Sequence, residues 1–200
     1  LTDRNRILQD YLEVVTFRDI IERHNIKNIT LIKYLLKFLL NNAGGSFSVN
    51  KIFNDLKSQG FAVAKNTLYD YFSHIEDAFI AFLVPLFSNS IRKTNSNPKK
   101  IYTIDSGLVN ACSFKTSKDW GHLFENLIYL DLRRQEKKIY YYLTQDRFEV
   151  DFLTENLKGE RELIQVVWDT SDDKTMARET RALEQAKKEL KLPGKIITPD

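Results

Sequence analysis

The chain has 200 residues, of which 42% are hydrophobic, 28% charged and 12% aromatic. This composition is typical of one folded domain or two small ones, and it excludes a disordered or fibrous protein. A single cysteine, Cys112, excludes an internal disulfide and a zinc site built from several cysteines, and it fits a reducing cytosol. No apolar run reaches the roughly 18–20 residues that a membrane helix requires. We therefore expect a cytoplasmic protein without a membrane segment.

The formal net charge of +3 is unevenly distributed along the chain. Residues 29–112 carry 9 basic and 5 acidic side chains, whereas residues 113–200 carry 16 basic and 17 acidic ones. The first region is therefore modestly basic and the second is nearly neutral. A modest basic excess permits nucleic-acid contact but does not establish it.

Residues 1–28 are interpreted as a connector helix. Apolar residues follow helical spacing among charges from Arg4 to Arg23, and the pattern allows a break near Thr16 and Phe17. The next region, 29–112, predicts a winged helix-turn-helix domain. Its first helix starts at Thr30 and ends at the Asn-Ala-Gly-Gly sequence of residues 42–45.

The rest of this domain is predicted to contain two further helices and a hairpin. Ser48 caps the second helix, which Gly60 ends, and Asn66 or Thr67 caps the third. The third helix is expected to bury Leu68, Tyr71, Phe72, Ile75 and Phe79. Two strands, 79–87 and 100–104, follow and are joined by a polar, basic, turn-rich linker.

In this interpretation the third helix reads DNA and the hairpin linker is the wing. The residues expected to contact double-stranded DNA are Lys65, Asn66, Thr67, Tyr69, Arg92, Lys93, Lys99 and Lys100. The alternative is a small helical domain whose hairpin binds a protein partner or a neighbouring domain. Because a charge of +4 is low for a domain that contacts several phosphates, both alternatives stay open.

Residues 113–200 are predicted to form a compact α/β domain with the element order α-β-β-β-α-β. The expected elements are helix 120–134, strands 139–143, 147–153 and 162–168, helix 175–190 and strand 195–198. Glu125 stands inside the apolar first helix, three residues after His122. The histidines His24, His74 and His122 are dispersed in the sequence, so no metal cluster is expected among them.

Strand alternation brings polar residues of this domain together. It places Glu149 and Asp151 on one face of their strand, with Phe148, Val150 and Phe152 on the other. In the next strand Gln165 and Val167 share a face.

This arrangement resembles the restriction-endonuclease-like PD-(D/E)XK fold. The resemblance gives Asp151 the place of the metal-binding Asp, Gln165 that of the following Glu, and Glu125 that of the helix glutamate. It implies a divalent ion such as Mg²⁺ held by Asp151 and Gln165 if the site is active. The position of the lysine that activates water is Val167. Glu149 could substitute in part.

A valine cannot polarise water, and the neutral Gln165 weakens cation binding. Lys174 and Arg178 are candidates for a relocated basic group. We therefore favour a degenerate site over an active metal-dependent nuclease. Structural roles are the alternative: an ion pair of Glu125 with Arg147 or Arg178, an ion pair of Asp151, and a core amide in Gln165.

The whole chain is similar to the carboxy-terminal part of AAA-type ATPases of archaea and bacteria. The similarity rests on short stretches in the same order, among them 67–78, 102–108, 121–126 and 149–152. It implies an ATPase module as partner and an oligomer as a possible assembly. The chain starts at Leu1 and contains no Gly-x-x-x-x-Gly-Lys-Ser/Thr string, so we expect a non-motor fragment that binds DNA or a partner. A pure oligomerisation scaffold is a third alternative.

Overall fold

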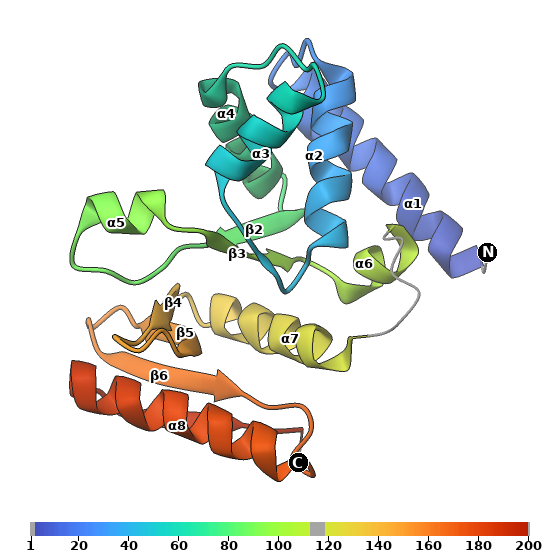
Figure 1. Cartoon of the computed structure of the whole chain (residues 1–200). Coiled ribbons are helices and arrows are strands. Elements are labelled where there is room, and N and C mark those ends of the chain that lie inside the picture. The colour runs from blue at the N-terminus through green and yellow to red at the C-terminus, as the bar shows by residue number, and fades with distance from the viewer. Residues whose placement is uncertain (1–2, 113–118, 200) are drawn as a thin grey trace. The chain divides into compact units, whose positions relative to one another are not determined.

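The computed structural model describes residues 3–112 and 119–199 (Figure 1). Its internal contacts divide the chain into two compact units. Unit 1 contains the described residues of 1–83 and 100–118, and unit 2 contains those of 84–99 and 119–200. No helix in the described ranges has the length and apolar character needed to cross a membrane. Both units mix helices and strands, as expected for a two-domain α+β chain.

Unit 1 is mainly helical. Its elements are α1 (Asp3–Val15), η1 (Thr16–Glu22), α2 (Ile29–Asn41), β1 (Ser46–Phe47), α3 (Val49–Ser58), α4 (Lys65–Asp77), β2 (Ala81–Val84), β3 (Lys99–Thr103) and α6 (Ser106–Cys112). The strands form a small sheet in the order β1-β3-β2. The three expected helices and both expected hairpin strands are present, and helix α6 was not predicted.

Capping explains where two of these helices begin. The side chains of Asn28 and Ser48 accept hydrogen bonds from backbone N–H groups in the first turns of α2 and α3. The chain leaves α3 through Gly60, whose φ of +84° favours glycine. The predicted caps of α4 are wrong, because α4 already begins at Lys65 and its N-cap residue, Ala64, offers no side-chain acceptor.

The buried face of α4 agrees with the prediction except at its end. Leu68, Tyr71, Phe72 and Ile75 belong to the core of unit 1. Phe79 lies beyond the end of the helix with a φ of +56° and is 56% exposed, so its predicted burial is wrong. The helical spacing does not extend to it because α4 stops at Asp77.

The expected break in the connector is confirmed as a change of helix type. The α-helix α1 ends at Val15, and the π-helix η1 follows from Thr16 to Glu22. The Thr16 hydroxyl donates to the Leu12 carbonyl at 2.6 Å, at the point where the change occurs. π-helical turns are rare and often lie at functional sites.

Unit 2 is built on a four-stranded sheet. Its elements are α5 (Ile91–Ser96), α7 (Trp120–Arg134), β4 (Lys138–Leu143), β5 (Glu149–Glu155), β6 (Arg161–Val166), α8 (Asp173–Leu190) and β7 (Gly194–Ile197). The strand order is β4-β5-β6-β7, antiparallel except for the parallel pair β6 and β7. Helices α7 and α8 cover opposite faces of this sheet (Figure 1). The predicted element order from residue 120 onward is confirmed.

The hairpin linker belongs to unit 2 because it is bonded to β4. Tyr141 donates its backbone N–H to Pro85 and accepts from the N–H of Phe87, at 3.1 and 2.8 Å. The Tyr141 hydroxyl also donates to the Pro98 carbonyl at 2.6 Å. The linker therefore lies along an edge of the second sheet, and it contains the unpredicted helix α5.

Candidate functional site

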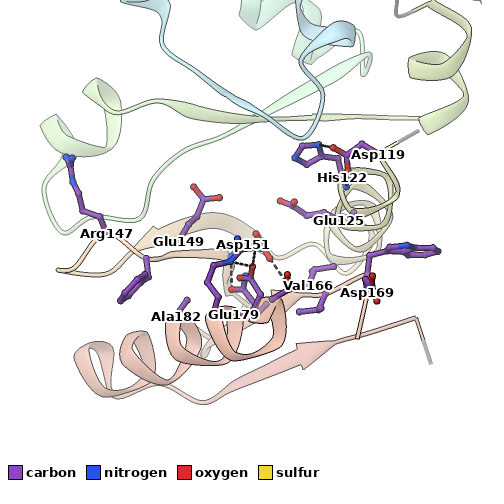
Figure 2. Close-up of a pocket in the computed structure, with 17 residues that line it drawn as sticks. Asp119, His122, Glu125, Arg147, Glu149, Asp151, Val166, Asp169, Glu179 and Ala182 are labelled. Carbon is purple, nitrogen blue, oxygen red and sulfur yellow. Dashed lines mark hydrogen bonds and ion pairs between the residues drawn. The ribbon is translucent and has the colours of Figure 1, made fainter. Parts of the chain in front are cut away.

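The candidate site is a cavity of about 580 Å³ in unit 2, lined by α7, α8 and the ends of β5 and β6 (Figure 2). Every member of the predicted constellation contributes to its lining: Glu125, Asp151, Gln165 and Val167. Glu149 and Arg178 line it as well, whereas Lys174 does not. Sequence reasoning therefore identified residues that the fold brings together.

The cavity opens where the β5–β6 ladder stops. Backbone pairing between these strands runs from Glu155 and Arg161 to Phe152 and Ile164. Beyond that point side chains connect the two strands. The Asp151 carboxylate accepts the backbone N–H of Val166 at 2.9 Å, and the N–H of Asp151 donates to the Gln165 amide oxygen at 3.4 Å.

A β-bulge in β5 sets the direction of the Asp151 side chain. Tyr140 pairs with Leu153 and Tyr142 pairs with Val150, so one residue of β4 lies opposite two residues of β5. Such bulges bend a strand and reorient its side chains, and they are frequent beside active sites.

The bulge also overturns part of the predicted strand alternation. Val150 and Leu153 pack together in the core next to α8, whereas Phe152 stacks on Tyr129 of α7 with ring centroids 6.4 Å apart. The expectation that Val150 and Phe152 share a face is therefore wrong. Asp151 and Glu149 nevertheless line the same cavity, as predicted.

Gln165 connects the sheet to α8. Its side chain is only 2% exposed, and its amide nitrogen donates to the Glu179 carboxylate at 2.7 Å. The other oxygen of Glu179 accepts from the Arg178 guanidinium at 2.6 Å. The side-chain amide of Gln165 thus accepts a hydrogen bond from β5 through its oxygen and donates one to α8 through its nitrogen. Such pairing is typical of a buried polar group with a structural role.

Glu125 enters the cavity from the opposite helix. It lies on α7 and is 8% exposed. The helix begins at Trp120, and the preceding Asp119 caps it by accepting the backbone N–H of His122 at 3.1 Å. The second carboxylate oxygen of Asp119 lies 2.8 Å from Nδ1 of His122, so the residue that caps the helix also contacts this side chain.

The lining of the cavity is strongly acidic. Its carboxylates belong to Asp119, Glu125, Glu149, Asp151, Asp169 and Glu179, against the two guanidinium groups of Arg147 and Arg178. This excess of negative charge favours cations and disfavours a phosphate that enters without a metal ion. All of these residues are described, and no three of their carboxylates bring oxygens within 4.8 Å of one another.

The residues implied for Mg²⁺ fit the ion poorly. Mg²⁺ requires near-octahedral oxygen coordination at about 2.0–2.1 Å. One carboxylate oxygen of Asp151 and the amide oxygen of Gln165 each already accept a backbone N–H. These hydrogen bonds occupy one acceptor position on each residue, so fewer lone pairs remain to complete the coordination of an ion.

Two exposed tryptophans at the rim escaped sequence reasoning. Trp168 lines the cavity and stacks on Trp120 with ring centroids 5.7 Å apart and planes inclined by 17°. Phe124 meets Trp168 edge-on at 5.7 Å. No spacing rule connects Trp120 with Trp168, because they lie at the start of α7 and beyond the end of β6.

The predicted DNA-contacting residues are distributed over both units. On α4, Asn66 and Tyr69 are exposed, and Lys65 and Thr67 are half-buried. On α5, Arg92 and Lys93 are exposed.

The two lysines at the start of β3 differ from this group. Lys99 is half-buried, and Lys100, expected on the surface of the wing, is 4% exposed. Lys100 and the three residues after it on β3 are all buried, so the position of Lys100 in the strand and not its charge decides its burial.

Comparisons with known proteins identify the family of this chain. Residues 1–119 match the family described as domain of unknown function DUF8612. The chain belongs to this family. Residues 120–198, from the start of α7, match a second domain of unknown function, DUF4143.

Two curated relatives are similar to the chain. One is the uncharacterized protein MJ1544 of Methanocaldococcus jannaschii, 37% identical over 98% of this chain and 44% of the relative. The other is an uncharacterized protein of Haemophilus influenzae, 24% identical over 66% of this chain and 33% of the relative. The chain thus spans less than half the length of either relative. No solved structure matches it.

Proposed function

We propose that this chain is the non-motor part of an AAA-type ATPase and works as a DNA-binding module with a non-cleaving, nuclease-like cavity. The match to DUF4143, a domain often associated with AAA-type ATPases, supports the first part of the proposal. The given sequence contains no P-loop string, so in this proposal ATP hydrolysis belongs to a separate ATPase module.

One observation carries the proposal that the cavity does not cleave DNA. Asp151 and Gln165, which would hold the metal, each use one acceptor position for a hydrogen bond to a backbone N–H group that joins β5 to β6. Val167, at the position of the catalytic lysine in the resembling fold, is buried and apolar. Positioned acid–base groups and charge stabilisation supply much of the catalysis of phosphodiester cleavage. The side chain of Val167 can supply neither.

The acidic cavity also directs DNA contact to other surfaces. Exposed Arg92 and Lys93 on α5 can each neutralise a phosphate, because neither is buried in the fold. On α4, the exposed Asn66 and Tyr69 lie in the first turns, with Lys65 at the first position of the helix. Polar side chains at the start of a recognition helix are suited to contacts with base edges and phosphates.

Salt-dependent binding to duplex DNA tests this proposal. The expected result is that replacing Arg92 and Lys93 together with Glu weakens binding and lowers the slope of log K against log salt by about 2. The matched control replaces Arg181 and Lys188, two exposed basic residues of α8, with Glu and so makes the same change in net charge. Equal weakening in both variants, or no duplex binding at low salt, rejects the proposal.

A metal-dependent nuclease is the second candidate, and the acidic lining favours it. Glu125 and Asp151 are buried beside further carboxylates, a setting that attracts a divalent cation. Supercoiled plasmid incubated with Mg²⁺ or Mn²⁺ decides the question. Cleavage by the wild type that is absent from Asp151→Ala supports the nuclease, whereas cleavage that survives this change comes from a contaminant.

A further inference from the structure

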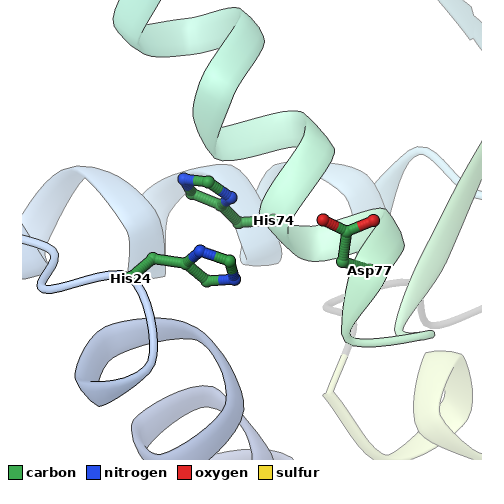
Figure 3. Close-up of side chains that lie close together, drawn as sticks. All are labelled: His24, His74 and Asp77. Atoms are coloured by element: carbon green, nitrogen blue, oxygen red, sulfur yellow. The ribbon is translucent and has the colours of Figure 1, made fainter.

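Unit 1 contains a pair of histidines in direct contact (Figure 3). His24 follows η1 and His74 lies on α4, and their rings stack with centroids 3.7 Å apart and planes inclined by 13°. The sequence-based expectation that the histidines are too dispersed to share a site is therefore wrong for this pair. Fifty residues separate them in the chain, and only the fold brings them together.

Each ring has a nitrogen that the surrounding fold leaves without a hydrogen bond. Nε2 of His24 and Nδ1 of His74 are buried and have no hydrogen-bond partner among the described residues. Buried polar atoms are nearly always paired, so an unpaired one needs a reason such as an ion or a functional role. Here two such nitrogens lie in one place.

A carboxylate completes the group. Asp77 follows His74 by three residues on α4, and the two therefore lie on the same side of the helix. One donor atom each from His24, His74 and Asp77 lies within 4.8 Å of the others. Two imidazole nitrogens and one carboxylate oxygen form the ligand set that Zn²⁺ accepts with a water at the fourth position.

We propose that His24, His74 and Asp77 bind a divalent transition-metal ion of the zinc type. Donor atoms around tetrahedral zinc are separated by about 3.4 Å, so the three side chains draw together on binding. A metal ion lies close to the plane of each imidazole that binds it, and therefore one ring must rotate out of the stack. Asp77 is exposed and its side chain can follow this movement.

The surroundings of His74 are compatible with metal binding. Burial and the neighbouring His24 together lower the pKa of His74, against the opposing effect of Asp70 and Asp77. A lowered pKa favours the neutral imidazole, which is the form that donates a lone pair to a metal. Binding connects the chain after the π-helix η1 to α4, the helix expected to contact DNA.

Calorimetric titration of the metal-free protein with Zn²⁺ tests the site. We expect one ion per chain, and more than about 100-fold weaker binding in His24→Ala and His74→Ala, because even loss of an outer-shell partner costs about 10–100-fold. Asp77→Asn is expected to weaken binding at least about tenfold. Co²⁺ in place of Zn²⁺ should give the visible absorption of a tetrahedral site, and this absorption should disappear in His74→Gln.

The chain supplies two matched controls. His122→Ala removes the third of its three histidines, and Asp70→Asn removes an exposed carboxylate on the same helix as Asp77. His122→Ala should bind Zn²⁺ as the wild type does, and Asp70→Asn, whose carboxylate acts on His74 only through its charge, should weaken binding less than Asp77→Asn. The proposal is overturned if Zn²⁺ does not bind, if His74→Ala leaves its affinity unchanged, or if His122→Ala or Asp151→Ala abolishes binding. If a variant does not fold, NMR of the wild type replaces it. Zn²⁺ should then shift the ring-nitrogen resonances of His24 and His74, and unchanged resonances would overturn the proposal.

Discussion

The histidine pair of unit 1 and the acidic cavity of unit 2 differ in what their polar atoms already do. In the cavity, Asp151 and Gln165 bond to backbone N–H groups and hold two strands together. In the histidine pair, Nε2 of His24 and Nδ1 of His74 make no hydrogen bond within the described structure. The residue types pointed to the cavity as the metal site, whereas the hydrogen bonds favour the histidine pair.

The largest expected effect tests whether the two units are stabilised independently. Phe152 is fully buried in unit 2 and stacks on Tyr129. Phe152→Ala should lower the free energy of unfolding of unit 2 by about 3–5 kcal/mol, because it leaves a cavity in the core. Hydrogen exchange should show faster exchange in unit 2 with unchanged protection in α2 of unit 1. Equal loss of protection in both units would contradict independent stabilisation.

Asp151→Ala tests the structural role of this carboxylate. It removes the acceptor of the Val166 N–H, and leaving such a donor unpaired costs about 1–3 kcal/mol of unfolding free energy. Denaturant unfolding measures the loss. Glu149→Ala, an exposed change two residues earlier on the same strand, is the control and should cost about 0.5 kcal/mol or less. If the two variants are equally stable, Asp151 does not hold β5 to β6.

A substitution in the histidine pair, unlike Asp151→Ala, is expected to change the stability of the protein little. His74→Phe replaces an imidazole with an unpaired buried nitrogen by an apolar ring. Because no hydrogen bond of that nitrogen is lost, the free energy of unfolding of the metal-free protein should change by less than about 1 kcal/mol. A much larger loss, measured by the same denaturant method, would assign His74 a structural role and remove the contrast with Asp151.

A dependence on pH is expected in unit 2. Burial, and next a hydrogen bond to Glu189, raise the pKa of Tyr142 to about 12. The folded-state pKa thus exceeds the unfolded value near 10, so the stabilisation is complete below pH 10 and is lost as pH rises toward 12. Tyr142→Phe should lose less unfolding free energy than the wild type across this interval. If the unfolding free energies of the two proteins depend on pH in the same way, Tyr142 does not cause this loss.

Much of unit 2 could be predicted from the sequence. Helix α7 has the predicted bounds, Trp120–Arg134, because its apolar pattern is continuous and Asp119 caps it. The strands were found from their apolar and β-branched runs. The convergence of Glu125, Asp151 and Gln165 followed from strand alternation and the fold resemblance.

Other features leave no trace in a local pattern. The bulge in β5 depends on its pairing with β4, and a period of two residues does not reveal one extra residue. Helix α5 is short and lies in a segment rich in Asn, Ser and Lys, which favours turns. The contact between His24 and His74 depends on how α4 packs beside the chain that follows η1.

The central claim, a module that binds duplex DNA without cutting it, is tested most directly by one gel. End-labelled duplex is incubated with the wild type at low salt in the presence of Mn²⁺, and the bound fraction is then recovered and denatured. We predict a shifted band whose DNA is recovered at full length. The absence of any shift would contradict this claim, and so would shortened DNA that returns to full length when the protein carries Asp151→Ala.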